Sequence, residues 1–317
     1  MSVNLEASAA PVPGAVVPGV APAPVAMERG NVAASEIVGD RPWYRGVETY
    51  VLWLILAIGA IAMIGPFYWM LVTSLKVRQE ILVYPPTWWP ETVTWRNWRT
   101  LNELPAGSFN AFFRNSIWVA FWVTFLTLLT SSMAGYVFAK LPFRGRDRLF
   151  WVVLGMMMVP FTVSLIPSYA LMDRFGWINS YWALVVPVAF SPFGIFLMRQ
   201  FMMSLPGDLL DAARMDGASE FRVFFQIVIP LSQAALAALG ILTFLAQWDN
   251  FLWPLVIIQD PDKWTIPMGL ANFRGRLGTD VGPTAAGSIF AVAPVIVVYI
   301  ILQRRVIEGI ALTGLKG

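Results

Sequence analysis

Apolar residues fall into six long runs along this chain, and shorter polar stretches separate them. Each run is close to the roughly 20 residues with which a helix crosses the hydrocarbon core of a bilayer. The pattern therefore predicts an all-α, polytopic membrane protein with six transmembrane helices, whose even number puts both termini on one side. The cores of the runs are 49–74, 111–138, 148–172, 181–203, 231–258 and 286–306.

The distribution of Lys and Arg residues indicates on which side of the membrane the two termini lie. The connection 140–148 carries four cations, whereas the connection 173–181 carries one. Because short cytoplasmic connections are enriched in Lys and Arg, both termini are predicted to be cytoplasmic. The long connections 76–110 and 259–287 are then external.

Composition supports a membrane protein and excludes several kinds of chemistry. Hydrophobic residues make up 57% of the chain and charged residues 13%, which is too apolar for an ordinary soluble domain. The chain has no Cys and no His, which argues against disulfide scaffolds, thiol nucleophiles, imidazole bases and the common zinc sites. We expect no metal and no cofactor. The cations lie at the ends of apolar runs and form no stripe, so nucleic acid is not an expected partner.

The first 45 residues differ from the rest. They are rich in Ala, Pro, Val and Gly as far as Val25 and show no sustained helical period. A signal peptide is disfavoured, because no basic region precedes Ala9 and Pro interrupts every apolar run. We therefore expect a disordered cytoplasmic tail over 1–45 and one membrane domain over 46–317.

A charged stretch between the fourth and fifth runs has the signals of two short helices. Asp208 is a candidate N-cap for the first helix, and Asp216 with Gly217 supplies a break. Ser219 can cap a second helix that runs toward Pro230. The pattern predicts a helical bend on the cytoplasmic face.

The spacing within this stretch carries a resemblance. Its order is Asp211-Ala212-Ala213, three residues, Gly217, nine residues, then Ile227, Ile229 and Pro230. It resembles the EAA loop (E-A-A-x3-G-x9-I-x-L-P) of permease subunits in binding-protein-dependent ATP-binding cassette (ABC) importers, with Asp for Glu and Ile for Leu. Other segments are similar to the second permease of maltose-type carbohydrate systems, and they are 115–116, 134–147, 193–201, 247–255 and 312–317.

The resemblance implies a function and a set of partners. Such a subunit pairs with a second homologous permease in the bacterial inner membrane, above two ATPase subunits, and receives a sugar from an extracytoplasmic solute-binding protein. Related permeases carry polyols or glycerol phosphodiesters, and both alternatives stay open. By the resemblance, the residues that couple this subunit to the ATPases are Asp211, Ala212, Ala213, Asp216, Gly217, Ile227 and Pro230.

The fifth run contains an ionisable residue, Asp249, between Trp248 and Asn250. A charge at mid-bilayer costs at least about 2.5–3.5 kcal/mol and often marks a cavity. Together with Asn115, which opens the second run, these residues are candidates for a translocation path. The alternative is structural, with Asp249 capping a helix near the external interface.

The external connection 259–287 offers polar side chains for a partner. Asn272, Arg274 and Arg276 are candidates to contact the binding protein, as the corresponding loop does in maltose-type permeases. A solvated connector that folds on its own permease is the alternative.

No enzymatic centre is visible in the sequence. A G-x-x-x-x-G-K-[ST] phosphate loop is missing, so ATP hydrolysis is expected in partner subunits. A secondary transporter, the runner-up class, ordinarily shows more spans or several intramembrane acids. Prolines interrupt the third and fourth runs and predict kinks there. They are Pro160, Pro167, Pro187 and Pro192.

Overall fold

The computed structural model describes residues 44–103, 108–276 and 281–314, with side chains for 49–103, 108–272 and 281–301. Every regular element in these residues is helical, so the all-α prediction is confirmed for them. The predicted tail, 1–45, lies almost wholly outside the described residues. The elements are α1 (Tyr44–Ser74), α2 (Arg78–Ile81), α3 (Arg96–Thr100), α4 (Phe109–Lys140), α5 (Arg146–Met157), α6 (Phe161–Arg174), α7 (Tyr181–Val185), η1 (Val186–Val188), α8 (Pro192–Met203), α9 (Gly207–Met215), α10 (Glu220–Val223), η2 (a π-helix, Phe224–Val228), α11 (Ile229–Leu231), α12 (Gln233–Trp248), α13 (Leu252–Ile257), η3 (Pro261–Lys263), α14 (Ile266–Arg276) and α15 (Val281–Gly314).

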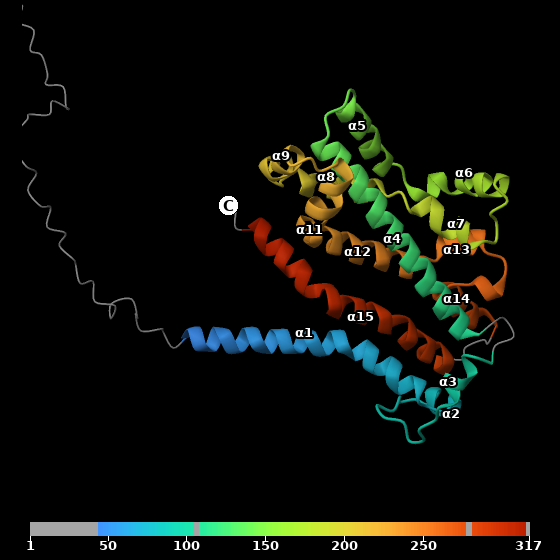
Figure 1. The fold of residues 1–317 in the computed structure, drawn as a ribbon. Helices are drawn as coiled ribbons and strands as arrows, with labels where there is room; N and C mark the ends of the chain where they lie inside the picture. The colour runs from blue at the N-terminus through green and yellow to red at the C-terminus, as the bar shows by residue number, and fades with distance from the viewer. Residues whose placement is uncertain (1–43, 104–107, 277–280, 315–317) are drawn as a thin grey trace, which may run out of the picture. The chain divides into compact units, whose positions relative to one another are not determined.

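Two compact units divide the chain, residues 1–59 and residues 60–317, and the boundary lies inside α1. The packed core lies in the second unit. There α4 is the central helix, with α8 and α12 packed along it (Figure 1). It supplies Val123, Tyr136 and Phe112 to three separate clusters of buried apolar side chains. One helix therefore holds the three parts of the core together.

A close approach of backbones joins α4 to α8. A Cβ atom on Gly135 would lie 2.7 Å from the Cβ of Met198 and 2.9 Å from the backbone nitrogen of Arg199. Small residues at such a crossing allow helices in a membrane to pack closely. Gly135 is therefore required by the packing between the two helices.

In the part of the chain that the structure describes, three helices are each long and apolar enough to cross a membrane, Thr49–Ser74, Phe109–Lys140 and Val281–Ile301. Up to six spans result if each of three bent helix pairs counts as one. The bends are 100° between α5 and α6, 40° between the α7–η1 segment and α8, and 78° between the α10–α11 segment and α12. Five of the six predicted runs overlap these helices and pairs over most of their length, whereas the fifth run, predicted over 231–258, overlaps a pair that spans Glu220–Trp248.

Prolines account for two of the bends. Pro160 precedes α6 and Pro192 opens α8, as the predicted kinks require, whereas α6 continues through Pro167. The fifth run, predicted as one span over 231–258, is not one helix. Within this run, helix α12 begins at Gln233 and ends at Trp248. The chain then turns at Asp249 and continues as the separate helix α13.

The connection between α1 and α4 is folded against its neighbours. The side-chain amide of Asn97 donates to the carbonyl oxygens of Ser74 and Lys76, each at 2.9 Å. Burial opposes ionisation of Glu80, but hydrogen bonds from the backbone of Glu91 and from the Thr87 hydroxyl outweigh it and lower the pKa of this carboxyl. The connection is therefore an ordered cap on the end of α1.

Candidate functional site

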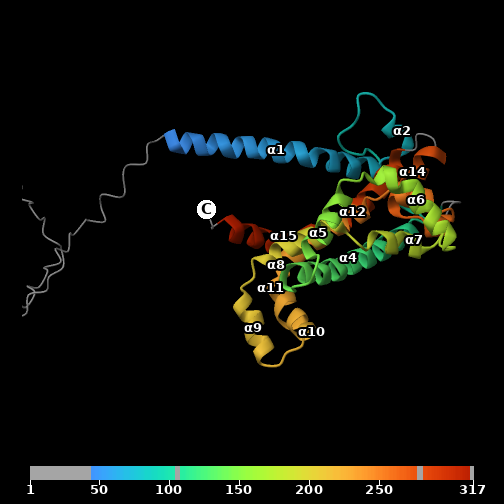
Figure 2. The same ribbon diagram turned by 90° about the horizontal axis from the view of Figure 1, so that it is seen from above.

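The stretch between α8 and α11 forms a helical hairpin, α9 followed by α10, which lie side by side in Figure 2. Helix α9 begins at Gly207 after Pro206, and no side chain caps it. The predicted cap at Asp208 is wrong, because Asp208 already lies in the first turn, where its charge favours the helix N-terminus.

The predicted break after α9 is confirmed. Gly217 has a φ of +80°, a left-handed conformation that residues with a Cβ rarely adopt. The amides of Gly217 and Ala218 donate to the carbonyls of Arg214 and Ala213, each at 3.0 Å. These bonds satisfy carbonyls that the end of α9 leaves unpaired. The hairpin therefore turns at a position suited to glycine.

The second helix begins as predicted. The Ser219 hydroxyl accepts a hydrogen bond of 3.4 Å from the backbone amide of Arg222. The helix then widens into the π-helix η2 just before Pro230, whose ring removes one backbone donor. At Ser232 the chain bends into α12. The motif thus ends at the bend of a helix pair that is long and apolar enough to cross a membrane only if both parts count as one span.

Apolar side chains of the hairpin divide between two faces. Leu210 and Phe224 are buried against Met198 and Met202 of α8. Other large apolar side chains project outward, with exposed fractions of 50% for Leu209, 83% for Met215 and 69% for Phe221. The hairpin is therefore anchored by its buried side chains and exposes other large apolar side chains. We call these three residues, Leu209, Met215 and Phe221, the outer face of the hairpin.

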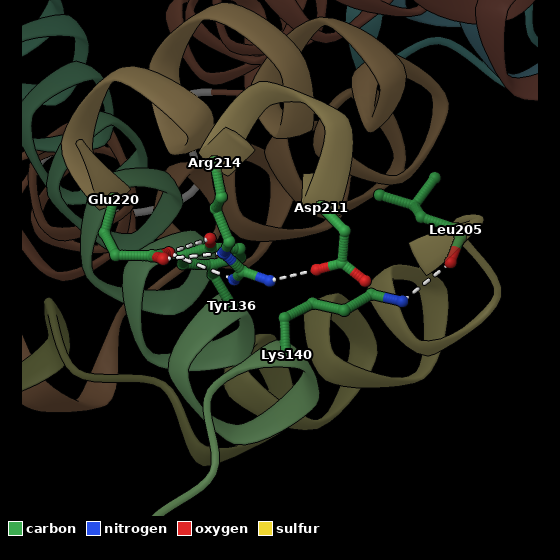
Figure 3. A network of polar contacts seen from close by, with 6 residues as sticks. All are labelled: Tyr136, Lys140, Leu205, Asp211, Arg214 and Glu220. Carbon is green, nitrogen blue, oxygen red and sulfur yellow. Dashed lines mark hydrogen bonds and ion pairs between the residues drawn. The ribbon is translucent and has the colours of Figure 1, made fainter. Parts of the chain in front are cut away.

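A polar network locks the hairpin to α4 (Figure 3). The Arg214 guanidinium lies 2.8 Å from Asp211 Oδ1 and 2.8 Å from Glu220 Oε1, so one side chain bridges α9 and α10. The Tyr136 hydroxyl donates to Glu220 Oε2 at 2.5 Å. The hydrogen bond that the Arg214 guanidinium donates to Glu220 raises the pKa of Arg214 above its usual value.

A second contact from α4 reaches the segment before the hairpin. Lys140 Nζ donates to the carbonyl oxygen of Leu205 at 2.6 Å (Figure 3). Sequence reasoning missed Tyr136, Lys140, Arg214 and Glu220 as members of this site. The sequence did offer one signal for the ion pair: Arg214 and Glu220 have opposite charges and each lies three residues from the turn at Gly217.

The remaining motif residues lie at the surface or between helices. Ala212, Asp216 and Pro230 are exposed, whereas Ala213 and Ile227 are half-buried against the cluster that contains Leu210. The structure therefore places the predicted coupling residues along one stretch of chain from α9 to α11, with Asp211 held by Arg214.

The residues predicted for a translocation path lie at the turn between α12 and α13 and on α4. Trp248 is buried, and its indole N–H donates to the carbonyl of Ala291 in α15 at 2.8 Å. Asn250 donates to the side chain of Gln247 at 3.3 Å. Asp249 is exposed and has no hydrogen bond or ion pair from its side chain among the described residues.

The carboxamide of Asn115 is fully engaged inside the protein. Its nitrogen donates to the carbonyl oxygens of Asp262 and Trp264 at 2.7 and 3.0 Å, and its oxygen accepts from the Tyr181 hydroxyl at 2.8 Å. The next residue, Ser116, accepts from the amide of Ile266 at 2.8 Å. The first turns of α4 therefore hold the segment that leads into α14.

The connection predicted over 259–287 is largely helical, since it contains η3, α14 and the first turns of α15. Asn272 is half-buried in α14. The side chains of Arg274 and Arg276 lie outside the described ones. No group of acidic residues that could hold a metal ion occurs in the part of the chain that the structure describes.

Comparison with known proteins identifies relatives over most of the chain. Residues 104–310 match the family model described as the inner membrane component of binding-protein-dependent transport systems. The arabinooligosaccharides transport system permease protein AraQ of Bacillus subtilis is 37% identical over 254 residues, 80% of this chain and 90% of that protein. The sn-glycerol-3-phosphate transport system permease protein UgpE of Pectobacterium atrosepticum is 32% identical over 263 residues, 81% of this chain and 94% of its own length.

A solved structure has the same fold. It is a bacterial ABC transporter involved in the import of the acidic polysaccharide alginate, and one of its chains matches this one with a TM-score of 0.71 and 22% identity. The match covers 81% of this chain and 96% of the other.

Proposed function

The chain belongs to the family of inner membrane components of binding-protein-dependent transport systems, and from this we propose that it is the permease subunit of an ABC importer that carries a sugar. Its partners are a second homologous permease, two ATPase subunits that hydrolyse ATP, and an extracytoplasmic solute-binding protein. Residues 46–317 form the transmembrane domain with six spans, and both termini are cytoplasmic. Sequence similarity to the arabinooligosaccharide permease supports the sugar, and similarity to the glycerol-3-phosphate permease keeps a phosphorylated polyol as the second candidate.

The hairpin is the element that couples this permease to the ATPases. One observation carries this assignment, the exposed outer face made by Leu209, Met215 and Phe221 on an element whose inner face is buried and linked to α4. Apolar groups that project from a fixed support form the kind of surface that a partner covers. Movement of the ATPases would then reach α4 through Tyr136 and Glu220.

A crosslinking experiment tests the assignment, and the absence of native Cys makes it clean. Met215→Cys should crosslink to an ATPase subunit in membranes, with a yield that changes on addition of ATP. The matched control is Asp173→Cys, an exposed position in the last turn of α6, which should give no such crosslink. A crosslink to the ATPase from position 173 and none from position 215 would contradict both the coupling role and the orientation.

For the solute path, we assign different roles to the four predicted residues. Asp249 faces the solute, because it is exposed and unpaired among the described residues, and Asn250 lies next to it with its side chain bonded only to the nearby Gln247. Asn115 and Trp248 shape the path, since their polar groups are already bonded to the protein. Uptake assays should therefore show that Asp249→Asn changes the apparent affinity for the solute, whereas a failure to change any uptake parameter would remove Asp249 from the path.

The binding protein docks on the external side near α14, with Asn272, Arg274 and Arg276 as contacts. The half-burial of Asn272 leaves part of its side chain accessible from outside. Asn272→Cys should crosslink to the loaded binding protein in a preparation that still transports. If no crosslink forms in such a preparation, the contact is refuted. Titrating that binding protein with sugars and with glycerol phosphates identifies the solute.

A further inference from the structure

A basic pocket and an apolar groove adjoin where α4 leads into α5. The pocket has a volume of about 580 Å³ and is lined by residues 142–148, which include Arg144, Arg146 and Arg148. We call it the arginine pocket. Asp147 also borders a second cavity of about 430 Å³. The walls of this second cavity, the aromatic groove, include Phe150, Trp151, Leu154 and Phe196.

Positive charge in this region exceeds the negative charge that the described side chains place beside it. Asp147 Oδ1 lies 3.4 Å from Arg146 Nε and 3.6 Å from Arg199 Nη2, so one carboxylate serves two guanidinium groups. The Arg199 guanidinium also lies 3.9 Å from the centre of the Phe150 ring. Arg144 and Arg148 are exposed and have no ion pair among the described residues. Two free cations therefore lie beside an apolar groove.

The chemistry of the two cavities matches an amphiphile with an anionic head. We propose that they bind an anionic phospholipid, with its phosphate in the arginine pocket and an acyl chain along the aromatic groove. Arginine forks pair well with phosphate oxygens, and basic pockets at the cytoplasmic ends of membrane helices attract anionic headgroups. Trp151, 71% exposed, is suited to the boundary between headgroup and hydrocarbon. The site rests on the proposed function for its position at the cytoplasmic leaflet.

Lipid binding to the complete, purified transporter complex tests the site. Phosphatidylglycerol and phosphatidylcholine are titrated against it, and bound lipid is counted by native mass spectrometry. The double variant Arg144→Gln/Arg148→Gln should bind phosphatidylglycerol about thirtyfold more weakly, since each cation near an anionic headgroup contributes a factor of about five. Its binding of phosphatidylcholine should not change. The control is Arg174→Gln, an exposed arginine at the end of α6, which should bind both lipids as the unaltered chain does.

Further measurements distinguish a lipid site from a site for a free anion and from an interface between subunits. Trp151→Ala should weaken retention of both lipids while the preference for phosphatidylglycerol remains. Equal affinity of the double variant and the control for phosphatidylglycerol would overturn the site. Displacement of the lipid by inorganic phosphate would also overturn the site, because it would assign the pocket to a free anion. A crosslink from Trp151→Cys to another subunit would overturn it as well, because the groove would then be an interface between subunits. ATP-driven uptake is measured on the same preparations, so selective lipid binding without uptake would count against the proposed function and not against the site.

Discussion

The two ends of α4 hold their surroundings in different ways. At one end, Asn115 and Ser116 bind backbone groups of residues 262–266 through neutral hydrogen bonds. At the other end, Tyr136 binds the side chain of Glu220, which also pairs with Arg214. The first set fixes a backbone, whereas the second set links side chains whose exposed fractions are 32% and 44% in the Arg214–Glu220 pair.

This difference between the two ends of α4 suits two tasks, holding the segment before α14 in place and transmitting movement from the hairpin. A backbone held by the half-buried Asn115 amide and the buried Ser116 hydroxyl has few alternative arrangements, because each lost bond leaves an unsatisfied group. Half-exposed ion pairs contribute little net free energy, about 0–1 kcal/mol each, and can be exchanged for water. The end near α14 is therefore built to stay in place, and the end near the hairpin is built to rearrange.

The largest effect is expected at the contact between α4 and α8 at Gly135, because both ends of α4 depend on it. Gly135→Leu would put side-chain atoms where Met198 and the backbone of α8 already lie, so α4 and α8 must separate. We expect loss of the folded protein from membranes, measured as yield and thermal stability in detergent. Gly155→Leu is the control, because no atom lies within 4 Å of the Cβ position at Gly155. Equal yields of the two variants would show that the close crossing is not required.

The same glycine shows how far the sequence could predict the fold. Six apolar runs are enough to predict the order and the approximate positions of the long helices and bent pairs, because bilayer length and hydrophobicity act on each run alone. The approach of Gly135 to Met198 depends on two runs together, and neither run indicates which small residue faces the other. The break at Asp249 lay inside a run that stays apolar on both sides of it, so hydrophobicity alone could not reveal it.

The site could be predicted in part for a similar reason. Gly217 and Ser219 act within their own turn, and their predicted places as a helix break and an N-cap are confirmed. Tyr136 is 84 residues away from Glu220 along the chain, so local spacing has no information about their hydrogen bond. Asn115 was predicted as a candidate for solute contact, and its bonds to Asp262 and Trp264 became visible only in the fold.

The next largest effect concerns the hairpin itself. Gly217→Val would force a β-branched residue into a left-handed conformation, which costs roughly 1–2 kcal/mol or more and redirects α10. We expect ATP-driven uptake to fall at least tenfold while the protein still inserts. Gly207→Val is the control, since it has open space around its Cβ position and no positive φ. Unchanged uptake in Gly217→Val would exclude a coupling role for the turn.

A smaller effect is expected at the end of α4 near α14. Asn115→Asp keeps the shape but places a carboxylate oxygen beside the carbonyls of Asp262 and Trp264, to which it cannot donate. The lost bonds should cost about 1–3 kcal/mol and loosen this segment. Asp262→Cys in this background should react with maleimide about tenfold faster or more. Asn110→Asp, an exposed change in the same helix, should leave the rate unaltered, and equal rates in both would refute the anchoring role.

The smallest effect is expected from the ion pairs that link the hairpin to α4. Arg214→Gln should reduce uptake only severalfold, because both of its pairs are partly exposed to solvent. Arg222→Gln, an exposed change on the same hairpin, should have no effect. Combining Arg214→Gln with Tyr136→Phe should give less than the sum of the single effects, since both residues act on Glu220. Additive effects would show that the two contacts work independently, and the hairpin would then be linked to α4 mainly by the buried side chains around Phe224.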